Sequence, residues 1–241
     1  MFRPIYEPRT RAREYCDLAI NIFNGCNHGC SYCYAKKMHD RYKPNEDFAD
    51  IKVREGIVEA TKQQLASGKY KGKKIMLCFM CDPYPADIDT TATREIIMAI
   101  KEAGANFTVL TKGGMRAIRD FDLYKPGDSF GSTLTMMPFT RYTEYWEPHA
   151  AEPMDRFQAI QIAHGKGIKT WLSLEPVIYP EDTLEIIKWT HGFVDLYKVG
   201  TINYDSRKKE IDWKDFGHKA IELLEHYGKE YYIKEDLKAY L

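Results

Sequence analysis

Short apolar runs recur along the 241-residue chain, and each is long enough for one buried strand. They lie at about 18–24, 74–80, 106–111, 129–135, 168–175 and 194–200. A continuous apolar run of this length is typical of a strand buried on both faces, as in a parallel sheet. The apolar residues of the intervening segments have helical spacing. These segments lie at about 52–66, 90–104, 114–122, 154–165, 181–190 and 212–227.

The alternation of strands and helices predicts an α/β fold with parallel strands joined by crossover helices. Six strand-helix units are fewer than the eight of a closed barrel. We therefore expect a single domain over 1–241, a partial (β/α)6 TIM-like barrel. Its core would occupy about 17–200, followed by a helical extension over 201–241.

Charge adds little to this picture, because 35 basic residues balance 35 acidic ones. This balance excludes a strong overall attraction to nucleic acid or to an anionic membrane, and it leaves local patches. The basic segments 69–74 and 205–210 could contact phosphates. They could equally be solvated loops, since neither is interleaved with the aromatic residues that single-strand binders use.

The first six residues lack the apolar core of a signal peptide, and no apolar run is long enough to span a bilayer. We therefore expect a cytoplasmic protein without a membrane partner, in a compartment where thiols stay reduced.

Three cysteines form a C-x3-C-x2-C motif, made by Cys26, Cys30 and Cys33. The spacing places three thiolates on one tight loop, which is enough to bind three irons of a four-iron cluster. An iron-sulfur cluster normally has four cysteine ligands. An iron without a protein ligand could bind a small molecule, so the motif indicates a catalytic cluster.

Other interpretations of these cysteines stay open. A structural zinc site could use the same thiolates with His28 or His39, because zinc sites favour short ligand spacings. A disulfide framework fits less well, since six cysteines in 241 residues do not resemble a small secreted scaffold.

Polar residues follow the predicted strands where a parallel barrel carries its catalytic and binding groups, at the carboxyl ends. They are the cysteine loop after the first strand, Cys78, Cys81 and Asp82 after the second, Lys112 after the third, Ser132 in the fourth, Glu175 after the fifth, and Gly200 and Thr201 after the sixth. The sequence therefore predicts one functional site at this end of the barrel.

The cysteine motif, with Tyr32 just before its last cysteine, resembles the signature of the radical S-adenosylmethionine (radical SAM) superfamily. Further motifs follow in order, namely Asp82-Pro83-Tyr84, Thr111-Lys112, and Glu147-Pro148-His149 with Arg156 after it. The ordered set is similar to the spore photoproduct lyase-like branch over about 17–200. A partial barrel is the usual fold of this superfamily.

The resemblance implies that the three cysteines hold one 4Fe-4S cluster and that SAM binds its open iron. In this superfamily one electron from the cluster cleaves SAM, and the resulting 5′-deoxyadenosyl radical abstracts hydrogen from the substrate. A low-potential electron donor such as a flavodoxin or ferredoxin is also implied. By motif match, Asp82, Lys112 and Ser132 would bind SAM, and Tyr32 and Tyr34 would lie near the cluster.

Each of these roles has a physical rationale and an alternative. Asp82 can accept from the amino group of SAM, but a residue before proline can simply start a turn. Lys112 can neutralise a carboxylate or extend into solvent, and Ser132 can hydrogen-bond the ribose or the carboxylate. Glu175 would pair with a cofactor or substrate donor, or with a barrel residue such as Lys198, because a buried unpaired carboxylate is unfavourable.

Cys78 and Cys81 are the candidates for a catalytic thiol, together with Glu175 as a catalytic carboxylate. Spore photoproduct lyase returns a hydrogen atom from a cysteine three residues before the Asp, where this chain has Phe79. The lyase reaction itself is therefore left open. Cys81 could instead contact the cofactor, and Cys78, like Cys16, could be a buried apolar residue.

The segment 136–149 is the strongest candidate to face a substrate, because it is long, aromatic and rich in methionine. Tyr84, Tyr145 and Trp146 could stack on a base or pack in a core. Three hypotheses stay open: action on a nucleic acid base, extruded if it lies in a duplex; modification of a peptide or small metabolite; or a non-catalytic zinc or iron-sulfur module.

Overall fold

Within residues 2–140 and 142–241, which the computed structural model describes, seven parallel strands form one sheet in the order β1-β4-β5-β6-β7-β8-β9. The strands are β1 (Leu18–Ile20), β4 (Lys74–Leu77), β5 (Asn106–Thr111), β6 (Ser129–Thr133), β7 (Lys169–Leu174), β8 (Leu196–Val199) and β9 (Glu230–Ile233). Every neighbouring pair is parallel. The predicted partial barrel is therefore confirmed. Arg141, in the segment predicted to face a substrate, lies outside the described residues.

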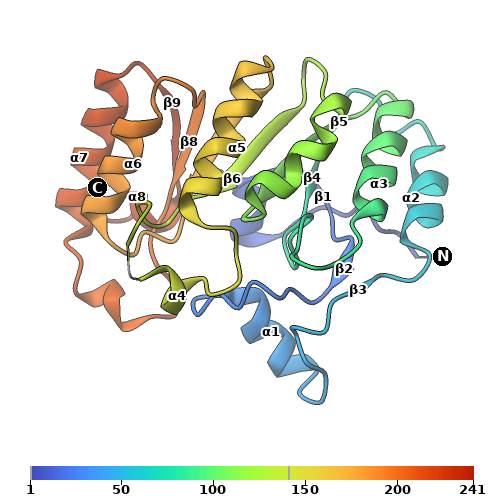
Figure 1. Cartoon of the computed structure of the whole chain (residues 1–241), viewed down its shortest axis with the longest axis horizontal. Helices are drawn as coiled ribbons and strands as arrows, with labels where there is room; N and C mark the ends of the chain where they lie inside the picture. Colours follow the sequence, from blue (N-terminus) through green and yellow to red (C-terminus); the bar gives the residue numbers. More distant parts are fainter. Residues whose placement is uncertain (1, 141) are drawn as a thin grey trace.

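Helices connect the strands and cover the outer face of the sheet (Figure 1). The α-helices are α1 (Tyr34–Tyr42), α2 (Ile57–Leu65), α3 (Thr91–Glu102), α4 (Thr143–Trp146), α5 (Pro153–Gly165), α6 (Pro180–Thr190), α7 (Trp213–His226) and α8 (Glu235–Lys238). The 3-10 helices are η1 (Thr10–Glu14), η2 (Gly114–Leu123) and η3 (Ser206–Lys209), and a small antiparallel ribbon pairs β2 (Phe23–Asn24) with β3 (Lys52–Val53). No helix among the described residues is long and apolar enough to cross a bilayer.

The sheet has one strand more than the six that the apolar runs predicted, because β9 lies in the segment expected to be a helical extension. Its sequence is Glu-Tyr-Tyr-Ile, and none of the four residues is fully buried. An edge strand is covered on fewer sides than a central one, so it needs no continuous apolar run.

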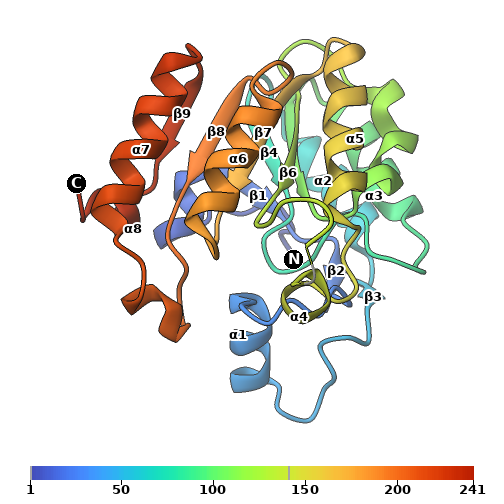
Figure 2. The ribbon, with the colours of Figure 1, turned by 60° about the vertical axis from the view of Figure 1, so that its left-hand side comes forward.

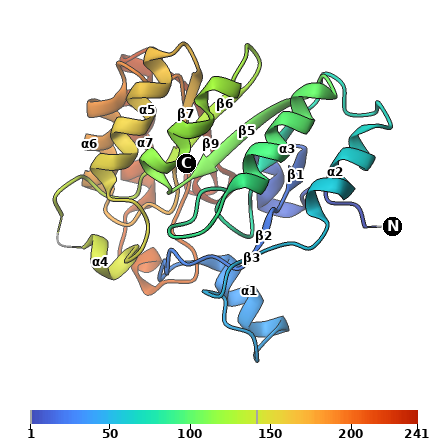
Figure 3. The same ribbon diagram turned by 45° about the vertical axis from the view of Figure 1, so that its right-hand side comes forward.

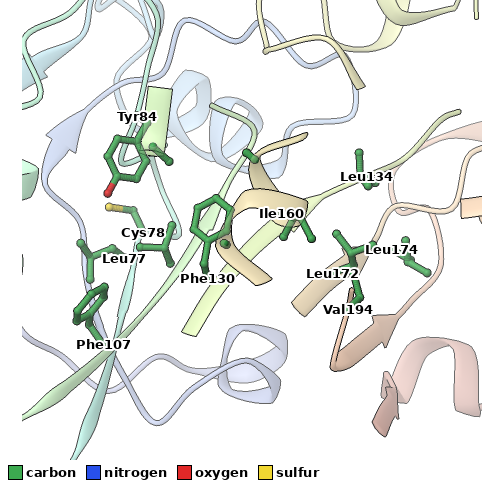
Figure 4. Packing of buried hydrophobic residues seen from close by; sticks show 14 of the residues in the cluster. Leu77, Cys78, Tyr84, Phe107, Phe130, Leu134, Ile160, Leu172, Leu174 and Val194 are labelled. Atoms are coloured by element: carbon green, nitrogen blue, oxygen red, sulfur yellow. The ribbon is translucent and has the colours of Figure 1, made fainter. Parts of the chain in front are cut away.

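Alternating side chains divide the sheet into two apolar faces. The outer face packs against the helices, and Figure 4 shows Phe107, Phe130 and Leu172 gathered there with Ile160 of α5. The inner face carries a smaller cluster built on Ala19, Met76 and Trp171. This inner cluster fills the barrel and supports the cavity at the carboxyl ends of the strands.

Gly131 lies opposite Trp171 in the register of β6 and β7. A Cβ atom at position 131 would lie 2.2 Å from Cε2 of Trp171, whose Nε1 donates to Thr108 Oγ1 at 3.1 Å. The indole ring therefore occupies the space that any larger residue at position 131 would need.

We predict that Gly131→Ala lowers the free energy of unfolding by about 1–3 kcal/mol, because it overpacks a filled interior. Gly165→Ala is the matched control, since nothing lies within 4 Å of a Cβ at this helical position. The control should be neutral or stabilising by up to about 1 kcal/mol. Urea unfolding of both variants measures the difference, and equal effects would contradict this account of the inner face.

Candidate active site

The three cysteines of the C-x3-C-x2-C motif line one cavity of about 380 Å³ at the carboxyl end of the barrel. This volume is within the range of small-molecule sites, about 300–1,000 Å³. All three thiols are free. The structure thus brings Cys26, Cys30 and Cys33 to the place where the sequence predicted a functional site.

The cysteine loop needs glycine where it turns. Gly25 has φ +84°, and a Cβ there would lie 2.5 Å from the carbonyl oxygen of Phe48. The same carbonyl accepts a hydrogen bond from Cys26 N at 2.8 Å. Only glycine adopts this conformation and permits this approach without strain.

The segment around α4 braces the other side of the loop. Ser31 N donates to the carbonyl of Trp146 at 3.0 Å, and His149 N donates to the carbonyl of His28 at 3.1 Å. These two backbone hydrogen bonds fix the conformation of the loop between its first and last cysteine.

Helix α1 begins directly after the last cysteine of the motif. The Cys33 sulfur caps the helix and accepts from Lys36 N at 3.4 Å. This cap fixes the orientation of the Cys33 side chain at the start of the helix.

Burial opposes ionisation of the other two thiols. It raises the pKa of Cys30 to about 11, although the Lys112 ammonium acts in the opposite direction, and it raises the pKa of Cys26 further. Three thiolates in one cavity need a compensating positive charge, which bound iron supplies. The donor set therefore fits an iron-sulfur cluster.

The zinc interpretation finds less support in the geometry. Among the described residues, no three His, Cys, Asp or Glu side chains converge on a single-ion site. His28 Nε2 accepts from Arg116 at 3.2 Å, and its Nδ1 faces Asp82 at 3.6 Å. Burial lowers the pKa of His28 to about 4, so the ring is neutral near pH 7. Both of its nitrogens already face a protein group and are not directed at the cysteines. His39 packs against Phe48 and does not line the cavity.

A fully buried ion pair lies behind the cysteine loop. Nη1 of Arg156 is 2.6 Å from Oε2 of Glu147. Arg156 also donates to the carbonyls of Ala151 at 2.6 Å and Thr133 at 3.1 Å, and the Tyr32 hydroxyl donates to Glu147. The sequence placed Tyr32 near the cluster, and the structure gives it the additional role of joining the loop to this pair.

Lys112 extends into the same cavity, with its ammonium 5.4 Å from the centre of the Tyr32 ring. Burial by itself would lower the pKa of Lys112, but negative charge on Cys30 and Glu147 raises it above the usual value. The ammonium makes no hydrogen bond or ion pair within the described part of the chain. It is a charged donor available to an anionic ligand.

Asp82 lines the cavity, but its carboxylate already has protein donors. Oδ1 accepts from Tyr84 N at 2.8 Å and from Thr111 Oγ1 at 2.6 Å, and Oδ2 accepts from Lys112 N at 2.8 Å. These contacts favour the second role considered for Asp82, that of a residue that starts a turn. Asp82 also positions the backbone of Lys112.

Ser132 does not line the cavity. It lies on the same face of β6 as Phe130, which faces the helices. The Ser132 hydroxyl donates to the carbonyl of Thr111 at 3.0 Å. Its neighbour Thr133 lies on the opposite face and does line the cavity. The sequence located the correct strand end, but an apolar run has no alternation from which the inward residue could be read.

Glu175 lies in the cavity and pairs with Lys234 at the end of β9, not with Lys198 as the sequence analysis suggested. The Tyr15 hydroxyl also donates to Glu175 and lies 2.9 Å from Ser173 Oγ. Tyr15 and Lys234 come from opposite ends of the sequence, so no local motif could identify them. Lys198 instead donates to the carbonyls of Glu14 and Tyr15.

Cys78 and Cys81 both line the cavity and differ in burial. Cys78 belongs to the outer hydrophobic core, and Figure 4 shows its side chain among Leu77, Tyr84 and Phe107. Burial raises the pKa of the Cys78 thiol well above its usual value. Cys81 is partly exposed on the cavity wall, so it is the more accessible of the two thiols.

The predicted substrate-facing segment is only partly available. Met136 and Trp146 are buried, whereas Tyr145 is 69% exposed. Tyr84 is also buried and donates to Asp120 at 3.1 Å, so it cannot stack on a base. Tyr34, at the start of α1, is 42% exposed beside the cavity, and its hydroxyl donates to the carbonyl of Phe79.

Comparison with known proteins places this site in a family. The model of the radical SAM superfamily matches residues 20–194. An uncharacterised protein of Methanocaldococcus jannaschii is 28% identical over 211 residues, which are 86% of this chain and 77% of that protein. One from Acidianus two-tailed virus is 26% identical over 185 residues, 70% of this chain and 59% of that protein.

Solved structures share the fold. A spore photoproduct lyase mutant with bound AdoMet and dinucleoside spore photoproduct has a TM-score of 0.70 at 13% identity, covering 93% of this chain and 78% of that one. SuiB of Streptococcus suis bound to S-adenosylmethionine has a TM-score of 0.68 at 10% identity, covering 92% of this chain and 48% of that one. With the matched family model, these findings show that the chain belongs to the radical SAM superfamily, whose enzymes use a 4Fe-4S cluster and SAM.

Proposed function

We propose that Cys26, Cys30 and Cys33 hold one 4Fe-4S cluster and that SAM occupies the rest of the cavity. The observation that carries this proposal is that three free thiols and the Lys112 ammonium line one cavity of ligand size. When bound, the cluster would supply the electron that cleaves SAM to a 5′-deoxyadenosyl radical, which abstracts hydrogen from the substrate.

The chain's own residues would bind and orient the cofactor. Lys112 neutralises the carboxylate of SAM with an ammonium that has no partner within the described residues. Asp82 holds the backbone of Lys112 in place. Thr133 and Glu175 offer hydroxyl and carboxylate oxygens to the other polar groups of the ligand. Cys81, on the cavity wall, is the candidate thiol for hydrogen-atom return.

For the substrate we propose a nucleic acid base. Support comes from the fold, which this chain shares with a spore photoproduct lyase that was solved with a dinucleoside photoproduct. A base in a duplex would have to be extruded to reach the cavity. The proposal also implies a low-potential flavodoxin or ferredoxin as the electron donor and a reducing compartment such as the cytoplasm.

We predict that anaerobic reconstitution with iron and sulfide, followed by dithionite and SAM, yields 5′-deoxyadenosine with the wild type and none with Cys30→Ala. Loss of one of three protein ligands leaves the cluster incompletely bound. Cys16→Ala is the matched control, because Cys16 lies outside the cavity, with its thiol donating to the carbonyl of Lys74. A colourless wild type that holds zinc and forms no 5′-deoxyadenosine would refute the proposal.

The buried Glu147–Arg156 pair provides a second test of the cluster assignment. Burial is the main cause of the raised pKa of the Cys30 thiol. Among the nearby charges, Lys112 and Arg156 lower this pKa, whereas Glu147 raises it. Reduction adds negative charge to a cluster, so nearby fixed charges shift its reduction potential. A negative charge lowers the potential and a positive charge raises it.

We predict that Glu147→Gln raises the reduction potential of the reconstituted cluster, that Arg156→Gln lowers it, and that the double variant returns close to the wild type. Each single variant leaves a buried charge unpaired, which destabilises the fold by about 3–5 kcal/mol, whereas the double variant removes both charges. Potentiometric titration followed by EPR measures the shifts. Shifts of the same sign in both single variants would indicate distortion of the loop and contradict the electrostatic role.

A further inference from the structure

Helix α1 exposes an apolar stripe at the end of the barrel that holds the cavity. Tyr34, Met38 and Tyr42 lie four residues apart, on one face of the helix, and are 42%, 45% and 72% exposed. Of the nine residues of α1, Ala35 alone is buried. Figures 1 and 3 show the helix projecting away from the layer of helices that covers the sheet. Contiguous exposed apolar side chains indicate an interaction surface.

The exposed apolar stripe of α1 begins at the wall of the cavity. Tyr34 and Met38 line the cavity, and α1 begins at the cluster-ligand candidate Cys33. Lys37 joins the helix to the loop after β8, because its ammonium donates to the carbonyl of Tyr204 at 3.0 Å and lies 5.2 Å from the centre of the Tyr204 ring. Figure 2 shows this loop descending to the same end of the molecule as α1. Tyr204 is 75% exposed and adds a further ring to the surface.

Positive charge accompanies these rings. Helix α1 and the residue after it carry Lys36, Lys37, Arg41 and Lys43 against a single acidic residue, Asp40. The loop after β8 adds Arg207, Lys208 and Lys209 against Asp205 and Glu210. Lys36 and Lys43 form surface ion pairs with Asp40 and Glu46. Segments 34–43 and 204–210 together carry seven basic and three acidic residues, so this end is locally basic. The basic segment 205–210 contains no aromatic residue. It directly follows Tyr204, and the fold brings it close to the aromatic residues of α1.

We propose that helix α1 and the loop 204–210, here called the α1 track, bind a single-stranded polynucleotide and lead one of its bases into the cavity. This inference rests on the proposed function, since the track would deliver the substrate. Bases stack on exposed rings while Lys and Arg contact the phosphates. An acidic protein would also match the charge, but the exposed rings of Tyr34, Tyr42 and Tyr204 beside basic side chains offer the stacking surfaces that single-strand binders use.

The test measures binding of a fluorescently labelled oligothymidylate by anisotropy between about 50 and 200 mM salt. The variant Lys36→Ala/Arg41→Ala/Lys43→Ala, which keeps the contact of Lys37 with Tyr204, should bind at least about tenfold more weakly, with a salt slope reduced by about 2. Tyr42→Ala should weaken binding by about tenfold without changing the salt slope. The control Lys69→Ala/Lys71→Ala/Lys73→Ala removes the same charge from exposed lysines just before β4, at the opposite end of the strands, and should bind like the wild type.

Equal weakening by the two triple variants would overturn the proposal, because binding would then follow net charge alone. Normal oligonucleotide binding by the α1 variant, with loss of its reduction by a flavodoxin, would also overturn it and assign the surface to an acidic protein. Formation of 5′-deoxyadenosine by the wild type with dithionite and no oligonucleotide is measured separately. Its absence alongside normal oligonucleotide binding would refute the proposed function and leave the α1 track in place.

Discussion

The buried ion pair between Glu147 and Arg156 is the interaction on which the site depends. It joins three parts of the chain, because Arg156 of α5 holds the carbonyl of Thr133 at the end of β6 while Glu147 receives the hydroxyl of Tyr32 from the cysteine loop. Two charges without solvent are unfavourable unless they remain paired. The pair therefore fixes the position of a loop that has little regular structure of its own.

The ends of the sequence complete the opposite side of the cavity. Tyr15 follows η1, Lys234 follows β9, and both contact Glu175 at the end of β7. A sheet of seven strands does not close on itself as an eight-stranded barrel does, so its edges need other cover. The same residues that cover the edge supply a tyrosine hydroxyl and an ammonium to the cavity. Stability of the open barrel and polarity of the cavity wall are thus provided by one set of contacts.

The sequence predicted those features that depend on local pattern. Apolar runs located six of the seven strands, and their order identified the end of the barrel that carries Cys26, Cys30, Cys33 and Lys112. The pattern could not predict β9, where Glu230 is exposed and the other three residues are only half-buried at the edge of the sheet. It also could not distinguish Ser132 from Thr133, because both are small polar residues in a strand without alternation. The sequence also could not predict the contacts of Glu175, because only the complete fold brings Tyr15 and Lys234 together.

Helix α1 was also missed, and the reason bears on function. The expected helices were found from an apolar face that packs on the sheet, whereas α1 buries Ala35 alone and presents Tyr34, Met38 and Tyr42 to solvent. A short helix with so little packing gains little stability from the core. Its position is set instead by the cap at Cys33 and by the contact of Lys37 with the loop after β8. A helix held at its first turn and exposed along its length therefore presents its outer face to solvent beside the cavity that Tyr34 and Met38 line.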